Sequence, residues 1–103
     1  MRIPPEEILD QIRATAIVEL KKDFLGLKAN GIAYLEKGST GWITMKWTED
    51  GIPSLMDLVG ITNVANNTHR TVLLSWLSDG VEQTVFIPYT ELNIVKKLKA
   101  WDS

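Results

Sequence analysis

The segment that most constrains the fold of this chain spans residues 71–92, TVLLSWLSDGVEQTVFIPYTEL. Two runs rich in aliphatic, β-branched and aromatic residues are separated by Asp79-Gly80, a pair that readily adopts the positive φ angles of a type I′ turn. The pattern predicts a β-hairpin with a two-residue turn. On one face of that hairpin the predicted cross-strand pairs are those expected of a core: Leu74 with Val85, Val72 with Ile87, and Trp76 with Gln83.

The opposite face of the same hairpin is also apolar. There Leu73 lies opposite Phe86, and Leu77 lies near Glu82. A sheet that buries only one face would leave this stripe in water. The second face therefore requires a cover, which the chain can provide by a terminal helix, by closure of the sheet into a small barrel, or by binding another chain.

Both ends of the chain carry helical patterns. Pro4-Pro5 followed by Glu6-Glu7 is typical of a helix start, and apolar residues then recur at helical spacing, which predicts an amphipathic helix over about residues 5–22. Near the other end, Thr90 is a suitable N-cap before an apolar stripe that includes Ile94 and Leu98. This predicts a second helix over about residues 90–101.

Further strands are predicted between the first helix and the hairpin. KANGIAYLEK and GWITMKWTED, joined by a loop at residues 38–41, form a predicted hairpin in which Tyr34 lies opposite Met45 and Ile32 opposite Trp47. A strand is predicted at about residues 58–64. The expected fold is a single α+β domain over residues 1–103, with about five antiparallel strands in a strongly curved sheet or small barrel between the two terminal helices.

Residues 58–92, LVGITNVANNTHRTVLLSWLSDGVEQTVFIPYTEL, show a recognisable order of predicted elements: a strand, a polar turn, a strand ending in an acidic-Gly turn, and a strand leading into Glu91-Leu92. In this order of strands and turns they resemble SH3-like and Tudor-like small β-barrels over about a third of the chain. Such barrels bind peptides, modified side chains or nucleic acid, so the resemblance implies a binding function rather than catalysis, although a fold alone does not determine function.

The composition excludes several kinds of chemistry. The chain has no cysteine and one histidine, His69, so disulfides, thiolate nucleophiles and the usual zinc sites are excluded, and no metal site or cofactor is expected. Eleven Lys and Arg against thirteen Asp and Glu do not favour nucleic acid as the partner. Without an apolar run of membrane-spanning length or a signal-peptide pattern, we expect a soluble, cytoplasmic protein with no membrane contact.

Three function classes follow from the candidate residues. The favoured one is a non-enzymatic binding or interaction protein that uses an apolar and aromatic sheet face and contacts a protein partner or a second copy of itself. That predicted interaction face consists of Trp42, Leu73, Leu77, Phe86 and Trp101.

Two alternatives remain open. A small-molecule-binding domain or small enzyme would place a pocket between helix and sheet, with Tyr34 and His69 as its polar groups. A nucleic-acid-binding small barrel would use Lys96, Lys97 and Lys99. Lysines near a helix C-terminus also stabilise the helix itself, so this cluster has a structural explanation as well.

Overall fold

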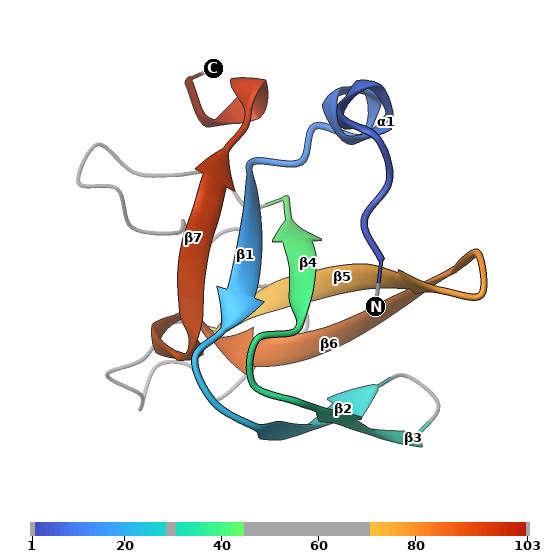
Figure 1. Ribbon diagram of the computed structural model, residues 1–103, viewed down its shortest axis with the longest axis vertical. Coiled ribbons are helices and arrows are strands. Elements are labelled where there is room, and N and C mark those ends of the chain that lie inside the picture. Colours follow the sequence, from blue (N-terminus) through green and yellow to red (C-terminus); the bar gives the residue numbers. More distant parts are fainter. Residues whose placement is uncertain (1, 29–30, 45–70, 103) are drawn as a thin grey trace.

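The computed structural model of the protein describes residues 2–28, 31–44 and 71–102, and these residues form a mostly β structure (Figure 1). In these three ranges, seven strands make two antiparallel sheets, one of five strands in the order β6-β5-β4-β1-β7 and one of the two strands β2 and β3. The strands are β1 (Ala16–Leu20), β2 (Phe24–Lys28), β3 (Gly31–Leu35), β4 (Thr40–Ile43), β5 (Thr71–Ser78), β6 (Val81–Pro88) and β7 (Leu92–Lys97). Within the described residues, the helical elements are α1 (Glu6–Gln11) and the 3₁₀ helices η3 (Tyr89–Glu91) and η4 (Lys99–Asp102).

The hairpin of β5 and β6 confirms the prediction from Asp79-Gly80. All predicted pairs are present, including Leu74 with Val85 on one face and Leu73 with Phe86 on the other. Asp79 has φ 52° and Gly80 has φ 77°, so both turn residues adopt the positive φ angles that the sequence indicated.

The predicted α+β class with two terminal helices is wrong. The N-terminal helix ends at Gln11 instead of continuing to residue 22, Arg13 adopts φ 59°, and Ala16–Leu20 is strand β1. The apolar spacing that suggested a helix arises because β1 is buried on both faces, so that its apolar residues also satisfy an i, i+4 pattern.

The predicted C-terminal helix over 90–101 is wrong for a related reason. Thr90 lies in η3, and Leu92–Lys97 is strand β7, which pairs antiparallel with β1 and has an irregular register beside Val18. Hydrogen bonding to the edge of β1 and burial of Leu92 in the core override the weak helical pattern of this segment.

The first predicted hairpin is also wrong in its pairing. Tyr34 pairs with Leu25 and Ile32 with Leu27, so β3 belongs to a hairpin with β2, while β4 pairs with β1 and β5. The predicted partners of β3 at residues 45 and 47, and the predicted strand over 58–64, lie outside the described residues.

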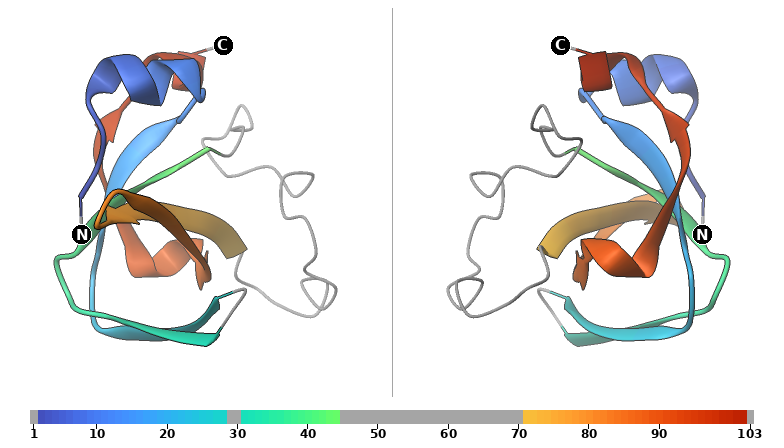
Figure 2. Two further views of the ribbon diagram at one scale, coloured as in Figure 1. Left: turned by 90° about the vertical axis from the view of Figure 1, so that its right-hand side faces the viewer. Right: turned by 90° about the vertical axis from the view of Figure 1, so that its left-hand side faces the viewer.

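The main core lies between the inner face of the five-stranded sheet and the β2–β3 hairpin, which packs across it (Figure 2). β2 approaches β6 closely, since a Cβ built on Gly26 would be 2.6 Å from Cγ2 of Val85. The buried residues of this core are Ala16, Val18, Leu20, Ala33, Leu35, Ile43, Val72, Leu74, Trp76, Val85, Ile87 and Leu92.

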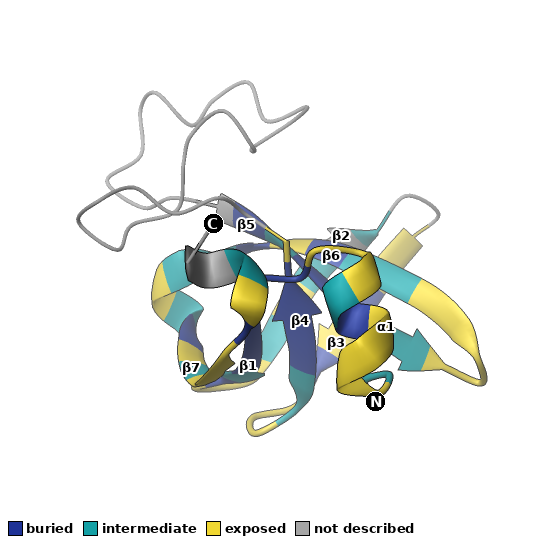
Figure 3. Ribbon diagram, turned by 90° about the horizontal axis from the view of Figure 1, so that it is seen from above, coloured by how far each residue is buried: buried dark blue, intermediate teal, exposed yellow. Residues whose placement is uncertain are grey.

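A second, smaller core lies on the outer face of the five-stranded sheet, where α1 covers it beside the buried strand β4 (Figure 3). It contains Leu9, Ala14, Ile17, Trp42 and Leu98, with Ile3 and Leu77 packed against it. The segment before α1 is anchored to β5 because the backbones of Arg2 and Leu77 exchange two hydrogen bonds of 3.0 and 2.8 Å. Both faces of the β5–β6 hairpin are therefore apolar because the main core covers one and the α1 core covers part of the other.

Candidate functional site

The residues of the predicted interaction face do not form one exposed surface. Trp42 is only 2% exposed and lies under α1, while Leu77 packs against the same cluster. Leu73 is half-buried, and Phe86 beside it is 42% exposed. Trp101 lies in η4, and its side chain is outside the described part of the structure. Of this set, Leu73 and Phe86 remain as a small apolar pair on the sheet.

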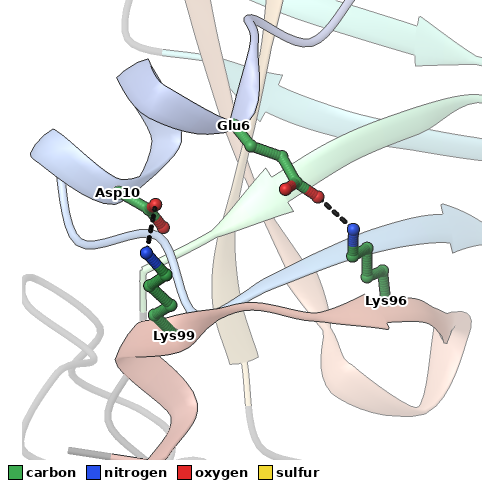
Figure 4. Close-up of polar contacts among 4 residues, drawn as sticks. All are labelled: Glu6, Asp10, Lys96 and Lys99. Carbon is green, nitrogen blue, oxygen red and sulfur yellow. Dashed lines mark hydrogen bonds and ion pairs between the residues drawn. The ribbon is translucent and has the colours of Figure 1, made fainter.

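The lysines proposed for nucleic acid lie along β7 and η4, close to α1. Lys96 forms an ion pair with Glu6, and Nζ of Lys99 lies 3.7 Å from Oδ2 of Asp10 (Figure 4). Lys97 is exposed on β7 between them. Lys96 and Lys99 thus contact carboxylates of α1, which reduces the positive field that a phosphate backbone would meet.

A different apolar surface is exposed on the β2–β3 hairpin. Leu25, Ile32 and Tyr34 are 65%, 67% and 61% exposed, and Leu25 pairs directly with Tyr34 across the two strands. They lie on the outer side because the alternate residues of β3, Ala33 and Leu35, point into the core. We call Leu25, Ile32 and Tyr34 the hairpin face.

The ring of Tyr34 is oriented by a polar contact beside this face. Its hydroxyl donates to Oδ2 of Asp23 at 2.9 Å, and the backbone N–H of Lys37 donates to Oδ1 at 2.8 Å. The Lys37 N–H and then the Tyr34 hydroxyl lower the pKa of Asp23, and the same hydrogen bond to Asp23 raises the pKa of Tyr34. Both shifts therefore have a local structural explanation.

A groove of about 730 Å³ lies between β3 and the turn end of the β5–β6 hairpin. Tyr34 lines it, so one predicted pocket residue lies at a real hollow, whereas His69 is outside the described residues. The lining residues are Lys28, Ala33, Tyr34, Leu35, Glu36, Ser39, Trp76, Ser78, Asp79, Val81 and Gln83.

The groove is not between helix and sheet, where the alternative prediction placed its pocket. Beneath α1 the space is filled by the side chains of Leu9, Ile17 and Trp42. A smaller hollow of about 210 Å³ lies between the end of α1 and η4, next to the ion pair of Asp10 and Lys99.

Within the described ranges, no three acidic or imidazole side chains come together in a way that could hold a metal ion, and no helix is long and apolar enough to cross a membrane. Comparison of the chain with known protein families, with curated proteins and with solved structures found no match. The resemblance of residues 58–92 to SH3-like and Tudor-like barrels stays a prediction.

Leu25 and Ile32 were not predicted as surface residues, although the sequence carries a signal for their hairpin. Asn30-Gly31 is one of the strongest short-range hairpin signals, and it lies where Phe24–Lys28 is followed by Gly31–Leu35. Pairing about Asn30-Gly31 puts Leu25 and Tyr34 on one face, although with Leu27 opposite Tyr34, whereas the structure pairs Leu25 with Tyr34.

Proposed function

We propose that this protein is a non-enzymatic interaction domain that contacts a protein partner through the hairpin face. The observation that carries the proposal is the exposure of Leu25, Ile32 and Tyr34, each more than 60% accessible, on neighbouring strands. Exposed side chains of this size gathered on one small sheet are typical of contact surfaces rather than of scattered surface residues.

The polar contact of Tyr34 supports the same function. Because Asp23 accepts a hydrogen bond from its hydroxyl, the ring is already restrained before a partner arrives, and less conformational entropy is lost on binding. Tyrosine is also among the residues that contribute most to protein interfaces. The Lys37 N–H and then the Tyr34 hydroxyl lower the pKa of Asp23, and the hydrogen bond to Asp23 raises the pKa of Tyr34, so neither shift requires a catalytic role.

The test is capture of partners from host lysate by the tagged protein and by two variants. Ile32→Lys places a charge in the hairpin face, whereas Val95→Lys makes the same kind of change at a similarly exposed residue on β7. We expect a specific protein to bind the wild type and Val95→Lys and to be lost with Ile32→Lys.

Other outcomes contradict the proposal. Equal capture by both variants would place the contact elsewhere on the molecule. Bound material that nuclease removes would support the lysines of β7 instead. Self-association that Ile32→Lys abolishes, measured by sedimentation velocity, would identify the partner as a second copy.

A further inference from the structure

The groove follows the edge of β3 rather than one face of it. Four successive residues, 33–36, line it, although neighbouring residues in a strand point to opposite faces. Ala33 and Leu35 are buried in the core, whereas Tyr34 and Glu36 are exposed. Only the backbone edge of the strand can be adjacent to all four residues, so the hollow lies alongside that edge.

This edge has hydrogen-bonding capacity. In the described part of the chain β3 pairs with β2 alone. In an antiparallel pair, alternate residues direct their N–H and C=O groups away from the partner strand. Such a row of backbone donors and acceptors is a template for a further strand. Glu36 follows the strand, and its carbonyl oxygen already accepts a hydrogen bond from the backbone N–H of Ser39. The strand residues 33–35 span about 10 Å at about 3.3 Å per residue, which is the length of a short extended peptide.

The floor of the groove is the inner face of the β5–β6 hairpin near its turn. Trp76 pairs with Gln83 there, and Ser78 pairs with Val81. Closer to the core the inner face is buried, but at the turn end Val81 is 59% exposed. The turn projects from the rest of the fold in Figure 1. An added strand there would rest on the exposed aliphatic side chain of Val81, because Trp76 is only 5% exposed.

The charges of the groove favour a basic ligand. Glu36 and Asp79 contribute two carboxylates, against the single ammonium group of Lys28. A cationic side chain on the ligand would restore the balance of charge as it enters.

The same geometry disfavours a second copy as the occupant. If β3 paired with β3 of another molecule about a two-fold axis, each molecule would place its own β5–β6 hairpin beneath the two paired β3 strands. The two hairpins would then compete for the space under the paired strands. A single extended segment carries no such hairpin and fits between the edge and the floor.

We propose that the groove binds an extended segment of a protein partner, which adds to β3 as a third strand and directs a Lys or Arg side chain toward Glu36 or Asp79. This inference rests on the proposed function, because it names the kind of partner that the neighbouring hairpin face contacts. The segment would pair with the β3 backbone while the partner's remaining surface covers the hairpin face.

The experiment begins with a phage-displayed library of random heptapeptides, selected on the wild-type protein and depleted on the double variant Glu36→Lys/Asp79→Asn. Asparagine removes the charge at residue 79 and tolerates its positive φ angle. Both substituted residues are exposed, and circular dichroism checks that the variant folds. The enriched peptide is then synthesised unmodified and in two forms that are N-methylated at alternate residues. Glu7→Lys, on the exposed side of α1, is the control for a change of net charge.

We expect enriched peptides to contain Lys or Arg and to bind the double variant at least about tenfold more weakly, with little change for Glu7→Lys. One of the two N-methylated forms should lose binding, because only alternate amides of an added strand face β3. Amide hydrogen exchange in β3 should slow when the unmodified peptide binds.

The inference is overturned if no peptide is enriched, if both N-methylated forms bind as well as the parent, or if exchange in β3 is unchanged. The two proposals fail separately. Partner capture that depends on Ile32 but not on Glu36 and Asp79 rejects the groove and keeps the hairpin face. Peptide binding in the groove together with partner capture that ignores Ile32 rejects the hairpin face.

Discussion

Replacement of Gly41 by alanine should destabilise the fold strongly, because β4 and β5 approach each other closely at this residue. A Cβ at residue 41 would lie 2.3 Å from the backbone oxygen of Ser75 and 2.8 Å from Cδ1 of Leu74. Contacts between carbon and oxygen are normally about 3.3 Å or longer, so the two strands would have to separate by about 1 Å.

The obstacle determines the size of the effect. A carbonyl oxygen of the backbone cannot rotate aside as the end of a flexible side chain can, so we expect the upper end of the usual overpacking range, about 3 kcal/mol of unfolding free energy. For a domain of about 100 residues this corresponds to a fall in Tm of about 12–24 °C.

Urea denaturation and a thermal melt measure both quantities, with Gly38→Ala as the matched control. Gly38 has φ +85° and no atom within 4 Å of its added Cβ, so that variant carries the conformational cost alone, about 1 kcal/mol. A loss at Gly41 no larger than that of the control would refute the close approach of the two strands.

Three further predictions concern the core under α1, the contact between Asp23 and Tyr34, and the ion pairs of α1. Trp42→Ala should lower the unfolding free energy by about 3–5 kcal/mol in urea titrations, since the indole is buried under α1. A variant that lost partner capture but kept the stability of the wild type would contradict this. Asp23→Asn should bring the pKa of Tyr34 back toward its ordinary value of 10.0, as followed by carbon-13 NMR. Because the pKa of Asp23 is depressed in the fold, the stability that this carboxylate adds is complete above its ordinary pKa of 3.8 and is lost as pH falls through the depressed value. If the wild type kept the same excess of unfolding free energy over Asp23→Asn at lower pH, that result would argue against the contact. Lys96→Ala and Lys99→Ala should each lower the unfolding free energy by less than about 1 kcal/mol, since the lysine side chains of both ion pairs are solvent-exposed. A larger loss in a urea titration would contradict this exposure.

The sequence predicts the β5–β6 hairpin well, because two adjacent residues specify its turn. Asp79-Gly80 sets the register of β5 and β6, so every cross-strand pair follows from two residues. The apolar spacing in β1 and β7 predicts helices, whereas both segments are strands that pair with each other across most of the chain. No local pattern distinguishes β1, a strand buried on both faces, from one face of a helix when the run is only five residues long.

The candidate site was missed for the same kind of reason. Trp42 was expected on an exposed face because β4 was assigned to a hairpin with β3, whereas its true neighbours are β1 and β5, and α1 covers it. The prediction assigns residues 23–27, between the predicted helix and the predicted hairpin, to no element, so Leu25 of strand β2 is not among its candidates. The groove lies between elements that are far apart in the sequence, so no spacing could indicate it.

The pairing of β1 with β7 joins Ala16 to Lys97, close to the two ends of the described chain. Contacts of such long sequence separation slow folding, because most of the chain must be ordered before they form. During synthesis, β1 emerges before β7 and lacks one of its two neighbours until residues 92–97 have left the ribosome. Until then it presents an unpaired strand edge, which is the state most prone to aggregation. A shortened chain that ends before β7 would keep that exposed edge permanently, and would also lose the ion pair between Lys96 and Glu6 of α1.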